Sequence, residues 1–132
     1  MKREAIREKT MQLIFQMDVT GDFDFEKALP IEETANAIEK AQAVATLTAV
    51  RDHFDEITET INSNLDNWKP DRIAKVDLAI LRNAVAEMLY VEDLPTSISI
   101  NEAVNLAKKF GDDKSYAFVN SVLSKVAKGM EK

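Results

Sequence analysis

Four basic residues stand close together at the start of the chain: Lys2, Arg3, Arg7 and Lys9. They fall in the first two turns of a predicted helix, where the helix dipole disfavours cations, so their placement needs another reason. One interpretation is a phosphate-binding patch, because arginine forks and lysine ammonium groups bind phosphate well. Ordinary solvation of a charged chain end is the other. Phe15 lies further along the same helix, either as a stacking surface for a base or, as is usual for an aromatic in an apolar stripe, in the core.

The rest of the chain offers no catalytic or metal-binding pattern. Its 132 residues include no cysteine, which excludes thiolate metal sites, disulfides and cysteine catalysis. The single histidine, His53, has no partner at ligand spacing and no neighbouring nucleophile signature. Carboxylates are numerous, but nothing in the sequence pairs two of them in an apolar setting that would shift a pKa. The sequence therefore predicts neither an enzyme nor a cofactor.

The formal charge of -6 argues against a polyanion as partner, but this charge is unevenly distributed. Residues 1–17 carry four bases and two acids, a net of +2, and residues 67–132 carry ten bases and nine acids, a net of +1. Residues 18–66 hold twelve acids and three bases, a net of -9. A local basic patch can therefore meet nucleic acid while the acidic segment stays solvated or meets a basic protein. Solvated helix faces are the alternative explanation.

Apolar residues at helical spacing organise the chain. They predict a helix from Arg3 to Met17, one or two over residues 31–66, a buried central helix over residues 73–89, and two more on either side of Gly111. No stretch shows sustained strand alternation, a glycine-rich phosphate loop or a repeat. We therefore predict one compact all-α domain, residues 1–132, of six to seven helices.

The best-defined stretch is the pair of helices that meet at Gly111. Ser99 and Glu102 have the spacing of a capping box, which predicts that a helix begins at Ser99. Gly111 is expected to end that helix in the left-handed conformation. A second apolar stripe, over residues 118–126, predicts the next helix, closed by Gly129. The corner between the two helices is expected to hold these residues in water: Lys108, Lys109, Gly111, Asp112, Asp113, Lys114 and Ser115.

The chain also lacks the signals of export and membrane insertion. Its charged N-terminal sequence is followed by no apolar run of signal-peptide length. No segment approaches the roughly 18 apolar residues of a membrane span. We therefore expect a cytoplasmic protein that does not bind a membrane.

Three runs of the sequence are distinctive: RIAKVDLAILR (72–82), INEAVNLAKKFG (100–111) and SYAFVN (115–120). Together with Arg7, Glu8, Gln12 and Phe15, they resemble the NusB family of transcription antitermination factors. The resemblance is specific from Trp68 to Leu123, weaker across residues 1–17, and little more than helical character across residues 20–66. It implies an all-helical protein of two packed helical subdomains, with no enzymatic activity and no cofactor.

The resemblance also implies partners. Members of this family pair with NusE, a small-subunit ribosomal protein, and the pair binds the single-stranded boxA element of ribosomal RNA leader transcripts. Binding promotes read-through by RNA polymerase within an antitermination complex. The residues alone leave another function open, a helical protein-interaction or self-associating module whose basic N-terminus is buried in a homodimer.

Residue by residue, the resemblance places the RNA-binding site at the chain's start and at the Gly111 corner, side by side. Their chemistry suits single-stranded RNA, with cations for phosphate, polar groups for base edges and aromatic rings for stacking. Each residue also has a structural explanation, since aromatics on apolar stripes are usually core and a glycine after a helix usually ends it. The predicted RNA-binding residues are Lys2, Arg3, Arg7, Phe15, Lys109, Phe110, Gly111, Ser115, Phe118 and Asn120.

Two expectations concern affinity and the protein partner. With about three or four phosphate contacts, RNA binding by the free protein should be weak and steeply salt dependent. The basic ribosomal protein is expected to meet the acidic residues 18–66, or Asp77 and Glu87 on the central helix.

Overall fold

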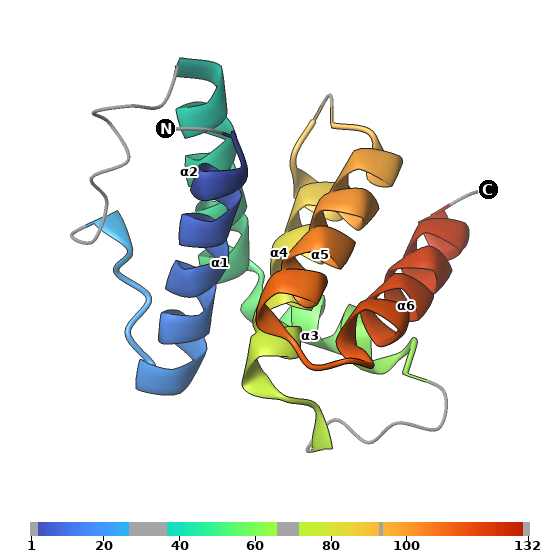
Figure 1. Ribbon diagram of the computed structural model, residues 1–132. Coiled ribbons are helices and arrows are strands. Elements are labelled where there is room, and N and C mark those ends of the chain that lie inside the picture. Colours follow the sequence, from blue (N-terminus) through green and yellow to red (C-terminus); the bar gives the residue numbers. More distant parts are fainter. Residues whose placement is uncertain (1–2, 27–36, 66–71, 93, 131–132) are drawn as a thin grey trace.

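The computed structural model describes residues 3–26, 37–65, 72–92 and 94–130, without the side chains of Arg3 and Glu4. Within these ranges the chain forms six α-helices and no strand (Figure 1), which confirms the all-α prediction. Lys2 lies outside the described residues. The helices are α1 (Arg3–Thr20), α2 (Ala37–Asp52), α3 (Phe54–Asn62), α4 (Lys75–Tyr90), α5 (Thr96–Phe110) and α6 (Ser115–Met130).

Helix α4 is the centre of the fold. It packs against each of the other five helices, and every residue from Asp77 to Met88 is buried. Figure 1 shows α1 and α2 on one side of α4 and α6 on the other, with α5 between α1 and α6. The predicted central helix is therefore confirmed. None of the described helices is both long enough and apolar enough to cross a membrane.

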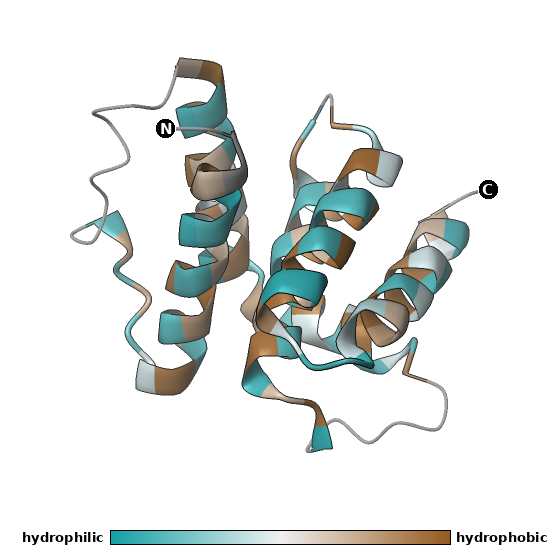
Figure 2. Cartoon of the chain, in the orientation of Figure 1, coloured by the Kyte–Doolittle hydropathy of each residue, from teal (hydrophilic) through white to brown (hydrophobic). Residues whose placement is uncertain are grey.

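Helix α1 is held against α4 along its whole length. Its buried apolar residues, from Ile6 to Met17, recur at helical spacing, and Figure 2 shows polar and apolar residues alternating along the helices in this way. Ion pairs join both ends of α1 to α4. Arg7, near the start of α1, pairs with Glu87, and the Asp18 carboxylate lies 2.9 Å from Arg82 Nη1. Because Arg82 precedes Glu87, α1 and α4 run antiparallel.

The predicted start of α5 is wrong. The helix begins at Thr96, one turn before Ser99, and no side chain caps it. Ser99 lies within the helix and is buried, and its hydroxyl donates a hydrogen bond to Glu87 Oε1 at 2.9 Å. The serine hydroxyl therefore satisfies a buried carboxylate from another helix and does not cap its own.

The end of α5 at Gly111 is predicted correctly, but the predicted conformation of Gly111 and the predicted role of Gly129 are wrong. Gly111 follows α5 as expected, but with φ -92° and ψ -173° it is extended and not left-handed. Space is the reason for glycine here, because a Cβ at Gly111 would lie 2.4 Å from Ser115 Cβ and 2.8 Å from the Ala107 carbonyl oxygen. Gly129 does not end α6, which continues to Met130, since a helix tolerates a single glycine at a cost of about 1 kcal/mol.

Candidate nucleic-acid interface

A groove of about 240 Å³ separates the first half of α1 from the second half of α5. Lys109 reaches across it, and its ammonium group contacts the Glu8 carboxylate. This contact places the end of α5 beside the second turn of α1, so the two predicted regions do lie side by side. The residues that line the groove are Arg7 and Glu8 from α1 and Glu102, Asn105, Leu106 and Lys109 from α5.

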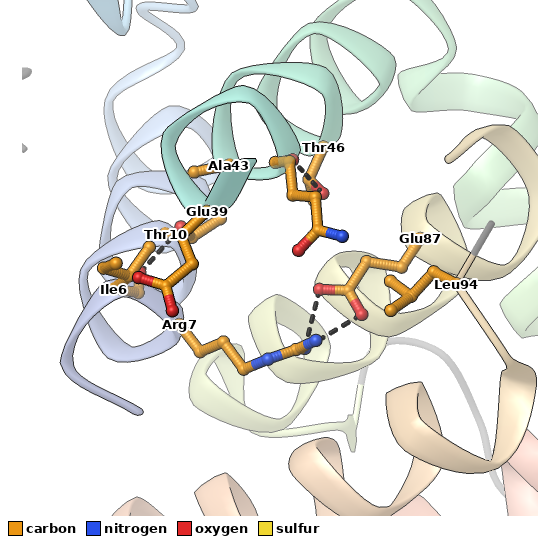
Figure 3. A pocket seen from close by; sticks show the side chains of 9 residues that line it. Ile6, Arg7, Thr10, Glu39, Ala43, Thr46, Glu87 and Leu94 are labelled. Atoms are coloured by element: carbon orange, nitrogen blue, oxygen red, sulfur yellow. Dashed lines mark hydrogen bonds and ion pairs between the residues drawn. The ribbon is translucent and has the colours of Figure 1, made fainter. Parts of the chain in front are cut away.

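Arg7 is not the exposed phosphate ligand that the sequence predicts. Only 8% of the residue is exposed, and its Nη1 donates to both carboxylate oxygens of Glu87, at 2.9 and 2.8 Å (Figure 3). Ser99 donates to the same carboxylate, and Glu102 lies 3.9 Å from Arg7 Nε. This network joins α1, α4 and α5. The Nη1 donor of Arg7 is therefore already engaged by Glu87.

Burial of the Glu87 carboxyl disfavours its charged form. It raises the pKa of Glu87, against the lowering effect of Arg7 and of the Ser99 hydroxyl. Figure 3 shows Arg7 and Glu87 meeting at one side of a small pocket between α1, α2 and α4. Its volume of about 20 Å³ has room for one water molecule and none for an organic ligand. On this side the network therefore holds α1 against α4 and leaves no room for an organic ligand.

Asp77 and Glu87 do not face a protein partner as expected. Both are buried, 8% and 5% exposed, and Ser115 at the corner is also buried rather than held in water. Ser115 Oγ donates to Asp77 Oδ2 at 3.1 Å and accepts from the Asp112 backbone N–H at 3.0 Å. These contacts fix the start of α6 on α4, so Ser115 acts by positioning the corner.

Replacing Asp77 by asparagine is expected to change how stability depends on pH. Burial raises the pKa of Asp77 above its ordinary value of 3.8, against the Ser115 hydrogen bond, and the charge of Asp112 adds to the rise. Ionising Asp77 therefore destabilises the folded state as the pH rises through its folded pKa. The unfolding free energy of Asp77→Asn, relative to the parent, should increase from pH 3 to pH 6. Urea titrations across this range test it, and a constant difference would contradict the assignment.

Two exposed aromatic residues flank the Gly111 corner, each beside a lysine. Phe110 is 37% exposed, with Lys109 Nζ 5.6 Å from its ring centroid. Tyr116 is 45% exposed, with Lys108 Nζ 5.4 Å from its ring centroid. The sequence prediction places Phe110 on an apolar stripe and misses Tyr116. Helical spacing sets Tyr116 seven residues before a buried leucine, so periodicity does not predict its exposure.

The remaining predicted residues divide between the core and the surface. Phe15 and Phe118 are partly buried and pack against the core, whereas Asn120 is exposed. Phe15 lies seven residues after Glu8, hence on the same face of α1, two turns further along. Among the described residues no three histidine, aspartate or glutamate side chains form a group that could hold a metal ion.

Comparison with known proteins identifies the family. Residues 4–128 match the model of the NusB family. "Transcription antitermination protein NusB" of Bacillus subtilis (strain 168) is 46% identical, covering 99% of this chain and 98% of its own, and that of Geobacillus kaustophilus (strain HTA426) is 46% identical over 100% of both chains.

Solved structures agree with this assignment. NusB of T. maritima superposes with a TM-score of 0.85 at 30% identity, covering 97% of this chain and 92% of its own. A NusB in a crystal structure of the antitermination factors NusB and NusE with dsRNA superposes with a TM-score of 0.80 at 25% identity, over 96% of both chains. This chain therefore belongs to the NusB family.

Proposed function

We propose that this protein is a transcription antitermination factor that works as a non-enzymatic RNA-binding adaptor in the cytoplasm. It pairs with NusE, a small-subunit ribosomal protein, to bind single-stranded boxA RNA of ribosomal RNA leader transcripts. The complex promotes read-through by RNA polymerase. The curated relatives are named transcription antitermination proteins, and a related crystal structure contains NusB and NusE with dsRNA, which supports an RNA-binding role together with NusE.

The position of Lys109 beside α1 carries the proposal. It brings the exposed ring of Phe110 close to the helix whose first residues are basic. Cations for phosphate and an open ring for a base are what single-stranded RNA requires. We assign Arg7, Gly111 and Ser115 to positioning this surface, and direct contact with RNA to Lys2, Arg3, Phe15, Lys109, Phe110, Phe118 and Asn120.

Glu8 competes with RNA for Lys109 in this proposal. The Lys109 side chain is 63% exposed and that of Glu8 is 22% exposed, so the ion pair adds little stability and opens readily. A phosphate that replaces the Glu8 carboxylate would keep Lys109 in the same groove. Removing the charge of Glu8 should therefore strengthen RNA binding, whereas removing that of Lys109 should weaken it.

The proposal predicts opposite effects for substitutions on the two sides of the groove. The protein, NusE and boxA RNA should form a ternary complex tighter than either binary one. Arg3→Gln with Lys109→Gln should make the slope of log affinity against log salt shallower by about 1.4, since each lost phosphate contact removes about 0.7. Glu8→Gln should raise RNA affinity about two- to fivefold. Fluorescence anisotropy over a salt series measures both effects.

A matched control is Lys128→Gln, which removes an exposed lysine from the last turn of α6, far from the groove. Its affinity and salt slope should equal those of the parent. The proposal is wrong if the parent gains nothing from NusE, or if all these variants bind RNA alike. A tight homodimer that sedimentation shows to be indifferent to RNA would instead support a self-associating module.

A further inference from the structure

The last turn of α5 has two sides that carry different lysines. Lys109 contacts Glu8 on α1, whereas Lys108 lies over the ring of Tyr116 on α6. Figure 1 shows α5 between these two helices. The Lys108–Tyr116 pair therefore lies across α5 from the groove that the proposed function assigns to boxA RNA.

The surface around Tyr116 has the chemistry of a nucleotide site. Its ring is 45% exposed in the first turn of α6, and Lys108 places a cation 5.4 Å from the ring centroid. Asn120 is exposed one turn later, on nearly the same face as Tyr116. Helix α6 itself carries no acidic residue from Ser115 to Met130.

The two acids nearest in sequence, Asp112 and Asp113, belong to the turn before α6. The Asp112 side chain is already engaged, because its Oδ1 accepts from the Lys114 backbone N–H at 2.9 Å. A planar, neutral base stacked on Tyr116 can tolerate these neighbouring carboxylates. RNA offers a planar base for the Tyr116 ring as well as a phosphate for Lys108, whereas an acidic peptide offers only carboxylates for the lysine, so the observations favour RNA.

We propose that Lys108 and Tyr116 form a second subsite for single-stranded RNA, next to Asn120, which the proposed function already assigns to boxA RNA. A base stacks on Tyr116, and a phosphate pairs with Lys108. The subsite takes nucleotides that flank those held between α1 and α5, across one helix diameter of about 10 Å. This inference rests on the proposed function and extends its RNA path over the outer side of α5.

The test compares two RNAs, boxA alone and boxA extended by a few nucleotides at either end, bound to the complex with NusE. The parent should bind an extended RNA more tightly than boxA. Tyr116→Ala should lower affinity for that extended RNA about tenfold, the typical loss of one stacked base, and leave boxA alone nearly unaffected. Tyr116→Phe keeps the ring and should bind as the parent does. Lys108→Gln should make the salt slope for the extended RNA shallower by about 0.7.

Tyr90→Ala is the matched control. Tyr90 is the last residue of α4 and is 37% exposed, similar to Tyr116. Its ring stacks on His53, and its hydroxyl donates to the Glu56 carboxylate of α3. Its removal should leave RNA binding unchanged. Thermal melts verify that every variant is folded, and photocrosslinking from 4-thiouridine in the extension should label the Tyr116 peptide.

Four results would overturn the subsite. Tyr116→Ala and Tyr90→Ala could bind the extended RNA equally, or the parent could gain nothing from flanking nucleotides. In both cases boxA binding by the parent would leave the proposed function standing. Weaker binding of NusE to Tyr116→Ala without RNA would instead assign this surface to the protein partner. If the parent complex binds no boxA RNA, the proposed function and the subsite fail together.

Discussion

Replacing Arg7 by methionine should lower the free energy of unfolding by about 3–5 kcal/mol at pH 8. Methionine replaces the aliphatic stem of Arg7 with an unbranched apolar side chain but supplies no cation. The Glu87 carboxylate, whose side chain is 7% exposed, is then left without its partner. Ser99 would remain its hydrogen-bond donor. A buried charge that loses its partner destabilises a protein far more than the pair had stabilised it, which is why the expected loss is large. Urea titrations followed by circular dichroism measure the change.

The double variant Arg7→Met with Glu87→Leu is the matched control. It removes both charges, so no carboxylate remains buried and unpaired, and it should regain most of the lost stability. If the single variant is as stable as the parent, or if the double variant is no better than the single one, Arg7 does not hold Glu87 as the structure indicates.

The loss in Arg7→Met should also depend on pH. Burial already raises the pKa of Glu87, and Arg7 is the largest influence that lowers it. Without Arg7 the folded-state pKa rises further, so the folded protein binds a proton that the unfolded chain has released. Stability is then lost as the pH rises through the folded pKa and regained below it. The deficit should therefore be smaller at pH 5 than at pH 8.

Local patterns in the sequence predict the helices well, because burial on one side of a helix repeats every three to four residues. The stripe of α1 and the central helix α4 follow from this period alone. The start of α5 does not, because the residue that looks like its cap has a distant partner, and Gly111 ends α5 at the predicted place for a reason of space. Ser99 hydrogen bonds to Glu87, and Gly111 makes room for Ser115. A capping box and a helix-stop glycine read from spacing cannot reveal such contacts.

The candidate site shows the same division. The family motifs predict that Lys109 lies beside the start of the chain, and its contact with Glu8 places it beside α1. Arg7 could not be placed by pattern, because its partner Glu87 lies 80 residues away in the chain. The exposure of Tyr116 was not predicted, because its local spacing is misleading. Its spacing is that of a core residue, and only the packing of α6 shows that the ring is exposed.

Replacing Gly111 by alanine should lower the free energy of unfolding by about 1–3 kcal/mol, the usual cost of overpacking. The backbone there is extended and would accept any residue, so the reason is space alone. The new Cβ would lie 2.4 Å from both Cβ and Oγ of Ser115 and 2.8 Å from the Ala107 carbonyl oxygen. Ser115 would have to move, and its hydrogen bond to the buried Asp77 carboxylate would be lost.

Gly129→Ala provides the opposite control for this substitution. Nothing lies within 4 Å of a Cβ at Gly129, which is part of α6. Alanine should therefore stabilise that helix by about 0.5–1 kcal/mol, through the lower entropy of the unfolded chain. Both variants are compared with the parent by urea titration. If Gly111→Ala also stabilises the protein, the corner is looser than described, and the positions of Phe110 and Tyr116 on either side of it are not fixed by Ser115.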